Sequence, residues 1–314
     1  MSERRIAPHR LLAAEARRLF TADLDAIANG LSLARENRDA GLHEARKSIK
    51  KARALLKLLR FADTEFYAAE NARLRDLARS LAHARDAAAL VEAVERLRLT
   101  YPDRAKALGL LKVLLEERRD RRVIEDGALD TLIEQGLQHA AQIRREVDRW
   151  RLPGEPEAAA SILADGVRDN LARAMRALER ASGRAENEDF HDLRKTVKAH
   201  WTQLGLLRDF WPKRVKTRRA RLEVLGESLG EHNDLAALAV LLRSRELDLK
   251  PSRVRLLRGI VAKRKAALAL STVKAGRRLL ERTPKRLKSN FVQRLQADGE
   301  PAIAANPALY GSRL

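Results

Sequence analysis

The stretches "LHEARKSIKKA" (residues 42–52) and "FHDLRKTVKAH" (residues 190–200) decide the fold, because they are two copies of one amphipathic helix. In each copy a histidine is followed at the third, fourth and seventh positions by Arg, Lys and Lys. Residues at this spacing lie on one side of an α-helix. Each copy therefore predicts a helix with a row of cations along one face.

The opposite face of each predicted helix is apolar. At 100° per residue the basic side chains of the first copy share a stripe about 120° wide. The residues that fall opposite are Ala45, Ile49, Ala52, Leu56 and Leu59 in the first copy, and Leu193, Val197, Leu204 and Leu207 in the second. His200 lies on the apolar side, so we predict a core histidine. Trp201 takes the place of Arg53, so the second copy has one positive charge fewer.

The similarity extends beyond these helices at a constant offset of 148 residues. Arg73 matches Arg221, "SL" at 80–81 matches "SL" at 228–229, and Asp86 matches Asp234. Such a register predicts a duplicated module. We divide the chain into a first bundle over 1–150, a second bundle over 151–296 and an extended tail over 297–314. The join is "WRLPGEPEA" (150–158), in which Pro156 suits the first turn of the next helix.

The composition predicts an all-helical protein. The 314 residues include only 15 Gly and 9 Pro, while Ala, Leu, Arg and Glu dominate, and these are good helix formers. Short connections imply antiparallel neighbours and a four-helix bundle in each half. The expected helices are 8–36, 39–62, 64–98 and 103–149, then 156–182, 187–209, 212–247 and 251–296, with a break expected within the last helix of each half.

The charge balance points to a polyanionic partner. Lys and Arg number 64 against 43 Asp and Glu, a net charge of +21. Seven basic residues lie between Arg46 and Arg60, and Glu44 is the sole acid in 43–60. Like charges one turn apart destabilise a helix, so a bound polyanion explains the pattern better than a solvated structural face. The chain has no Cys, no signal-peptide pattern and no long uncharged apolar run, so we expect a cytoplasmic protein without membrane insertion.

The doubled His-x-x-Arg-Lys-x-x-Lys helix in an all-helical chain resembles the CHAD family, the conserved histidine α-helical domain. A second family signature, Leu-Gly-x-x-Arg-Asp, has counterparts in "SLAHARDAAAL" (80–90) and "SLGEHNDLAAL" (228–238). The resemblance covers 8–296. It implies two four-helix bundles related by a pseudo-two-fold axis, with a basic groove or pore between them that binds inorganic polyphosphate. The resemblance is to a standalone polyphosphate-binding protein of this family, without a CYTH domain.

The resemblance also implies a set of ligand-facing residues. They are His43, Arg46, Lys47, Lys50, Arg53 and Arg85 in the first half, and His191, Arg194, Lys195 and Lys198 in the second. Arg85 has Asn233 as its counterpart, which departs from the family pattern. For Asp86 and Asp234, which match the family's aspartate, we favour a role in orienting basic side chains. From local basic clusters we add Arg118, Arg119, Arg264 and Lys265.

Polyphosphate fits these residues on physical grounds. It carries about one charge per phosphate and no bases, so it needs a track of Arg and Lys but no aromatic stacking platform. Aromatic residues make up only 4% of the chain, and no aromatic residues interleave with the basic ones. Two roles stay open for the histidines: donating to a phosphate oxygen, or packing between helices and positioning neighbours.

No catalytic motif in the sequence has the structural context that its chemistry requires. "GESLG" (226–230) matches Gly-x-Ser-x-Gly, but that motif needs a strand–turn–helix context, and here it lies in a helical segment. The seven His form no metal-binding pairs, and no phosphate-binding glycine loop is present. We therefore expect a protein that is not an enzyme and that has no cofactor and no metal site.

Three functions remain open at this point. The first is binding of polyphosphate, with targeting to polyphosphate granules. The second is non-specific binding of nucleic acid by a nucleoid-associated protein, which would use the same charge. The third is a non-catalytic scaffold for a phosphate-metabolising enzyme, whose partner protein the sequence does not identify. An exposed apolar patch on a bundle would favour the third.

Overall fold

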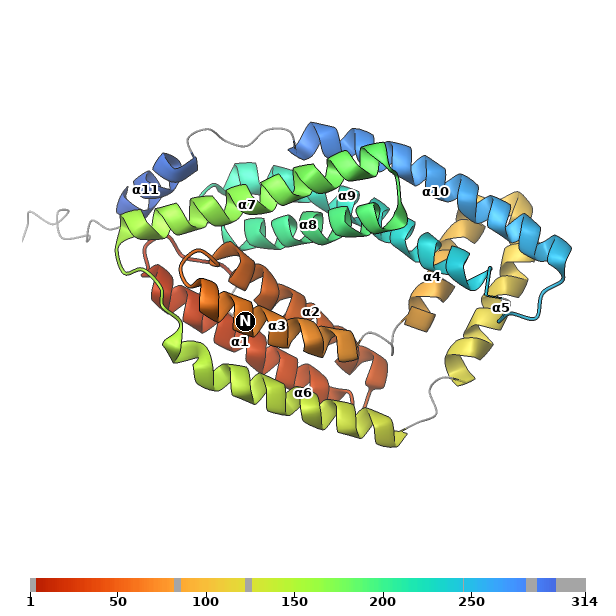
Figure 1. Cartoon of the computed structure of the whole chain (residues 1–314), viewed down its shortest axis with the longest axis horizontal. Helices are drawn as coiled ribbons and strands as arrows, with labels where there is room; N and C mark the ends of the chain where they lie inside the picture. Colours follow the sequence, from red (N-terminus) through yellow and green to blue (C-terminus); the bar gives the residue numbers. More distant parts are fainter. Residues whose placement is uncertain (1–3, 82–85, 122–125, 245, 281–286, 298–314) are drawn as a thin grey trace, which may run out of the picture.

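The computed structural model describes residues 4–81, 86–121, 126–244, 246–280 and 287–297. These residues form eleven α-helices, two 3₁₀ turns and no strand, so the all-helical prediction is confirmed (Figure 1). None of the described helices combines the length and the apolar character that a bilayer span requires.

The helices of the first 150 residues separate into two groups. In one group α1 and α3 pack against both α2 and α6, and the other group is a hairpin of α4 and α5 that lies apart from it (Figure 1). The first group comprises α1 (Leu12–Leu33), α2 (Arg38–Leu58), α3 (Thr64–Ser80) and α6 (Asp126–Glu146). The hairpin comprises α4 (Asp86–Thr100) and α5 (Ala105–Arg121).

In the second half, four long helices pack each against the next, from α7 to α10, and the short α11 packs back on α7. They are α7 (Pro156–Gly183), α8 (Asn187–Leu206), α9 (Pro212–Leu241), α10 (Pro251–Leu280) and α11 (Leu287–Ala297). Pro156 occupies the first turn of α7, as predicted. Pro fits there because its missing N–H would have no partner within the helix.

Two hydrophobic cores hold these helices together. The larger contains α1, α2, α3 and α6 together with α7, α8, α11 and the first half of α9, so it spans the predicted boundary at residue 150. The smaller joins the α4–α5 hairpin to the end of α9 and the start of α10. The division into two bundles and a tail stays a prediction.

The first half differs from the prediction in how its third helix runs. A single helix was expected over 64–98, whereas the structure has α3 and α4 as separate helices in different cores. Leu90, Val94 and Leu97 of α4 bury their side chains in the smaller core, against Leu235 and Leu238 of α9. This tertiary burial directs α4 away from α3, and no Pro or Gly in the sequence marks the change of direction.

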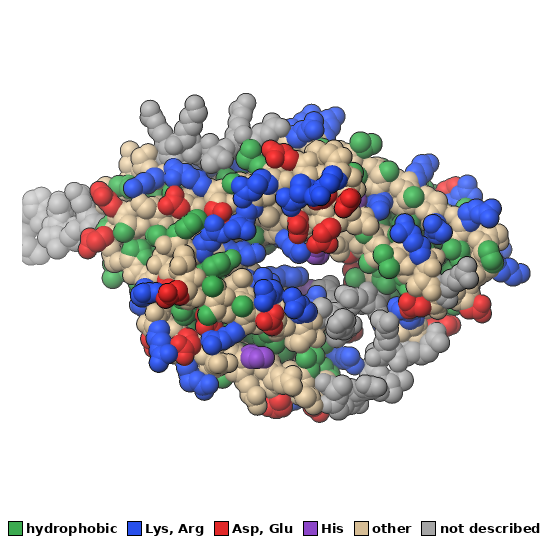
Figure 2. Space-filling view, in the orientation of Figure 1, with side chains coloured by type: hydrophobic (Ala, Val, Ile, Leu, Met, Phe, Trp, Pro, Cys, Tyr) green, Lys and Arg blue, Asp and Glu red, His purple; other side chains and the backbone are tan. Residues whose placement is uncertain are grey.

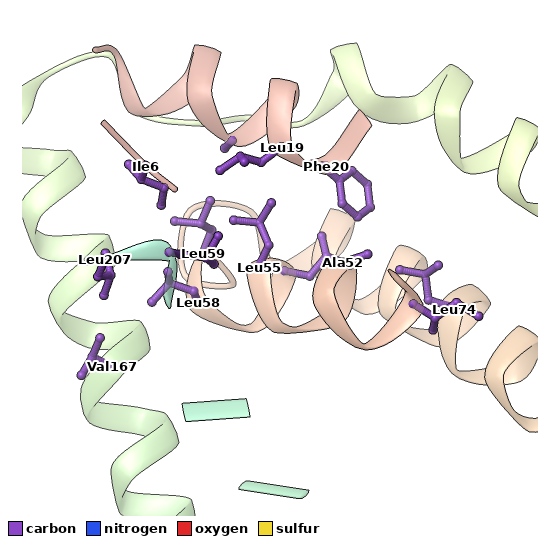
Figure 3. Packing of buried hydrophobic residues seen from close by; sticks show 14 of the residues in the cluster. Ile6, Leu19, Phe20, Ala52, Leu55, Leu58, Leu59, Leu74, Val167 and Leu207 are labelled. Atoms are coloured by element: carbon purple, nitrogen blue, oxygen red, sulfur yellow. The ribbon is translucent and has the colours of Figure 1, made fainter. Parts of the chain in front are cut away.

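The two halves meet where α2 crosses α7, and the backbones approach closely there. A Cβ atom added to Gly166 of α7 would lie 1.9 Å from the carbonyl oxygen of Leu58 in α2. Figure 3 shows Leu58 and Leu59 lying toward Val167 of α7 and toward Leu207, which follows α8. All four side chains are buried. Only glycine fits at this crossing.

The connection between the halves is fixed to the first half by an aromatic and an ionic contact. Trp150 is buried, and its ring stacks on Phe66 at a centroid distance of 5.0 Å. Asp63 caps α3 by accepting from the N–H of Phe66 at 3.1 Å, and it pairs with Arg151 at 3.0 Å. The hydrogen bond from Arg151 lowers the pKa of Asp63 to about 2.

We expect Gly166→Ala to lower the free energy of unfolding by about 2 kcal/mol or more, because the new methyl group overlaps the α2 backbone. Urea denaturation measures the change. Gly183→Ala, in the same helix, is the matched control, since a Cβ there meets no atom within 4 Å. Equal effects of the two substitutions would contradict the close crossing.

Candidate polyanion-binding site

The predicted basic face of α2 is only partly open to solvent. Its apolar face is buried as predicted, and Lys47 and Lys50 are exposed. His43, Arg46 and Arg53 are half-buried. Arg46 donates to the carbonyl of Leu81 at 2.7 Å, and Arg53 donates to Asn71 at 3.0 Å. Burial lowers the pKa of Arg53.

The second copy, on α8, has the same partly covered face. Lys195 is exposed, whereas His191, Arg194 and Lys198 are half-buried. His191 Nδ1 lies 2.6 Å from the side-chain oxygen of Asn233 on α9. The Nε of Arg194 is buried and has no hydrogen-bond partner among the described residues. The basic stripe is therefore only partly open to solvent: the end of α3 covers part of Arg46, and α9 covers part of Arg194 and Lys198.

The glycines of "GESLG" make room for these cations. A Cβ at Gly226 would lie 2.9 Å from Cε of Lys198, and a Cβ at Gly230 would lie 3.5 Å from Nε of Arg194. Ser228 lies within α9, and its hydroxyl donates to a backbone carbonyl one turn earlier at 3.0 Å. Gly226 therefore leaves room for the end of the Lys198 side chain against α9, whereas the distance at Gly230 is an ordinary van der Waals contact.

An aromatic side chain lies among the cations, contrary to the sequence prediction. Trp201 is half-buried, with the guanidinium of Arg219 4.3 Å from its ring centroid and the ammonium of Lys198 at 5.7 Å. No local pattern predicts this arrangement, because Arg219 comes from α9, eighteen residues further on. His200, by contrast, is buried as predicted, and burial lowers its pKa to about 3.

A cavity of about 310 Å³ lies between α2, α3, α7 and α8, and we call it the junction pocket. Six basic side chains and two carboxylates line it, with Tyr67, Asn170, Ala177 and Thr196. The charged residues are Lys57, Arg60, Arg173, Arg176, Arg180 and Lys195, with Asp169 and Asp192. Figure 2 shows Lys and Arg side chains gathered along the edges of an opening between the upper and lower groups of helices.

The ammonium group of Lys57 is half-buried and lies among other cations. Burial lowers its pKa to about 8, and repulsion from Arg53, Arg173, Lys195 and Arg60 adds to the effect. These four neighbours come from α2, α7 and α8, so cations of both halves act on one ammonium group. A bound anion would relieve this repulsion and restore the charge on Lys57.

The carboxylates of the junction pocket are held by its arginines and lysine. Asp169 pairs with Arg60 at 2.6 Å and with Arg173 at 2.9 Å. Asp192 pairs in the same way, with Lys195 at 3.2 Å and Arg180 at 3.3 Å. The two acids orient the basic side chains but neutralise only part of their charge. The pocket as a whole stays strongly positive.

The sequence prediction found only Lys195 among the charged residues that line the junction pocket. Lys57 and Arg60 are two of the seven basic residues between Arg46 and Arg60, but they belong to no motif, so the sequence analysis did not select them. Arg173, Arg176 and Arg180 recur at intervals of three and four, which places them on one face of α7. At the offset of 148 residues their counterparts are Asp25, Ala28 and Ser32, so this stripe exists in one half only.

The four cations predicted from local clusters have acidic or amide partners outside the junction pocket. Arg118 pairs with Glu246, and Arg119 pairs with Asp120 at 2.9 Å. Arg264 binds Glu231 through two hydrogen bonds of 2.6 and 2.9 Å, and Lys265 donates to Asn187 at 2.8 Å. Arg85 lies outside the described residues.

Asp234 connects the halves through an ion pair. It accepts from Arg96 of α4 at 2.7 Å, and Arg194 also lowers its pKa, although burial raises the pKa overall. This arrangement agrees with a role in orienting basic side chains. The side chain of Asp86 lies outside the described residues. Among the described residues, no cluster of three or more His, Asp or Glu is suited to hold a metal ion.

The fold and the site define a class: an all-helical protein with a doubled basic helix whose two copies contribute cations to one pocket. A sequence model of the CHAD domain matches residues 18–243. The chain belongs to the CHAD domain family, as its doubled histidine motif predicted. Among solved structures, it is similar to PptA from Streptomyces chartreusis, with a TM-score of 0.57 and 19% identity over 87% of this chain and 100% of that chain. At this identity the likeness concerns the fold alone. No curated protein sequence matches the chain.

The buried charge of Lys57 predicts a distinctive dependence of stability on pH. In the folded protein Lys57 loses its proton near pH 8, whereas in the unfolded chain it does so near its ordinary value of about 10.4. Between these values the unfolded state binds more protons, so this group makes stability rise with pH. We compare the free energy of unfolding of Lys57→Met with that of the wild type. We expect the value for Lys57→Met minus the value for the wild type to be largest below pH 8 and to fall from pH 8 to 10.

Urea unfolding of both proteins at pH 7, 8, 9 and 10 measures this difference. The comparison removes the effects of all other titrating groups, which the two proteins share. A difference that does not change with pH would mean that Lys57 keeps an ordinary pKa.

Proposed function

We propose that this protein is a non-catalytic module that binds inorganic polyphosphate at the junction pocket and along the exposed cations beside it. The observation that supports the proposal most strongly is the convergence of Lys57 from α2 and Arg60 just after it with Lys195 from α8 and three arginines from α7. Each of the two sequence repeats contributes to this one cluster. Membership of the CHAD family, to which polyphosphate-related binding belongs, agrees with it.

The chemistry of the junction pocket suits a chain of phosphates. Arginines offer paired N–H donors to phosphate oxygens, and lysines add point charges. The exposed Lys47 and Lys50 on α2 extend the positive surface beyond the pocket. Binding of this kind would place the protein on polyphosphate granules.

Nucleic acid is the alternative ligand for the same charge, but the aromatic side chains argue against single strands. Binding of single strands depends on aromatic rings that are open to bases. Trp201, the aromatic ring that lies among the cations of α8, is half-buried with Arg219 over its ring. Duplex DNA would be held by charge alone, and its binding would weaken steeply with salt.

Isothermal titration calorimetry with long-chain polyphosphate, and separately with a 20-base-pair DNA duplex, at about 0.15 M salt tests the proposal. The site variant replaces four exposed cations by Ala: Lys50, Arg173, Arg176 and Lys195. The control variant replaces four exposed arginines outside the junction pocket: Arg98, Arg104, Arg144 and Arg149. Both variants lose the same charge.

We expect the site variant to bind polyphosphate at least tenfold more weakly and the control to change by less than about threefold. Wild-type binding of DNA should be much weaker than binding of polyphosphate. Equal losses in the two variants would contradict a localised site, and tighter binding of DNA would favour the nucleic-acid alternative.

A further inference from the structure

A second hollow, of about 800 Å³, lies along α9 and α10 and has a different character from the junction pocket. We call it the α9–α10 groove. Small and apolar residues form most of its lining, with basic side chains and His232 among them. The apolar and small residues are Ala185, Ala239, Gly259, Val261, Ala262, Ala266, Ala269 and Leu270. Among the described residues, the linings of the α9–α10 groove and the junction pocket have none in common.

The floor of the groove is a stripe of small residues on α10. Gly259, Ala262, Ala266 and Ala269 recur at intervals of three and four, so they share one face of the helix. Gly276 lies seven residues further along the same face, and there α7 covers the stripe. A Cβ at Gly276 would lie 2.7 Å from a methyl carbon of Leu178 in α7. Small residues in such a stripe let two helices approach closely.

The cover over this stripe stops where α7 stops. α7 ends at Gly183, while α10 continues beyond that point (Figure 1). A Cβ added to Gly259 would meet no atom within 4 Å. The same face of α10 is therefore packed against a helix at one end and open at the other. Leu270, beside the stripe, is 76% exposed, and Leu256 is 40% exposed.

A buried polar atom without a partner lies in this groove. His232 is only 2% exposed, and its Nδ1 has no hydrogen-bond partner among the described residues. Its ring packs on Phe190 at a centroid distance of 4.2 Å. Burial, with a smaller contribution from Lys265, lowers the pKa of His232 to about 4, so the ring is neutral at neutral pH. A neutral imidazole nitrogen can bond a polar group of a bound molecule.

The charges around the groove are all positive. Arg243, Arg255, Arg258 and Lys265 belong to its lining, and none of the described residues that line it carries a carboxylate. Polyphosphate has no apolar surface to cover the alanines of the floor. A second copy of this chain, with a net charge of +21, would be repelled. The complementary partner has an apolar face flanked by acidic side chains.

We propose that the α9–α10 groove is a docking site for an acidic amphipathic helix of a partner protein, which continues the position of α7 along α10. From Arg255 to Leu270 the groove runs for roughly 22 Å along the helix, the length of about four turns. Docking an apolar helix face into a groove is a common mode of peptide recognition. The groove is the exposed apolar patch that a scaffold for another protein requires.

Fluorescence anisotropy at about 0.15 M salt with a labelled 18-residue peptide tests the proposal. The peptide carries Leu and Ala at helical spacing on one face and Glu on the flanks. A scrambled peptide of the same composition, which lacks the helical spacing, is its control. We expect the amphipathic peptide to bind at least tenfold more tightly than the scrambled one.

Gly259→Leu fills the groove without changing its charge, and it should weaken binding of the amphipathic peptide at least tenfold. Gly109→Leu is the matched control, because Gly109 lies in α5 and a Cβ there also meets no atom within 4 Å. Arg258→Glu should weaken binding of the acidic peptide, because it places a negative charge beside the peptide's Glu side chains. Titration with polyphosphate should be unchanged by Gly259→Leu.

Two results would overturn the proposal. Equal binding of the scrambled peptide would mean that charge alone attracts the probe. Unchanged binding of the amphipathic peptide to Gly259→Leu would mean that the groove is not the binding site. Neither result depends on whether the junction pocket binds polyphosphate.

Discussion

The close crossing of α2 and α7 is the constraint on which the rest of the structure depends. Gly166 allows the backbone of α7 to lie against the last turn of α2, at Leu58. The residue before Leu58 is Lys57, and the residue seven positions after Gly166, on the same face of α7, is Arg173. Contact at this point therefore brings cations from the two halves into one pocket. A bulkier residue at position 166 would separate the two halves of the site as well as the two halves of the core.

This arrangement places like charges together in a partly buried position, which is unfavourable without a ligand. The pKa of Lys57 is lowered first by burial and then by repulsion from its basic neighbours. Asp169 and Asp192 reduce the repulsion by pairing with neighbouring arginines and with Lys195. Six basic side chains still face two carboxylates. A polyanion would supply the missing negative charge, so the same electrostatics that destabilise the free protein favour binding.

The helical periodicity predicted the fold class, the buried faces of α2 and α8, and the core position of His200, because each depends on neighbours within one helix. It did not predict the junction pocket, since Arg173, Arg176 and Arg180 carry no family motif and meet Lys57 only through the crossing at Gly166. It also missed Trp201 beside Arg219, which come from different helices. The partial burial of Arg46, Arg194 and Lys198 was not predictable because a helical wheel contains no information about α3 and α9. The split between α3 and α4 follows from burial in the second core, to which both halves contribute.

The central claim is that polyphosphate binds against Lys57 and the cations of both halves, and proton uptake on binding tests it most directly. Calorimetric titration with polyphosphate at pH 9, in two buffers of different ionisation enthalpy, measures the number of protons taken up. At this pH Lys57 is mostly neutral in the free protein, and a bound polyanion should return its proton. We expect an uptake approaching one proton per site in the wild type and none in Lys57→Met. Binding without proton uptake in the wild type would contradict the placement of the ligand at the junction pocket.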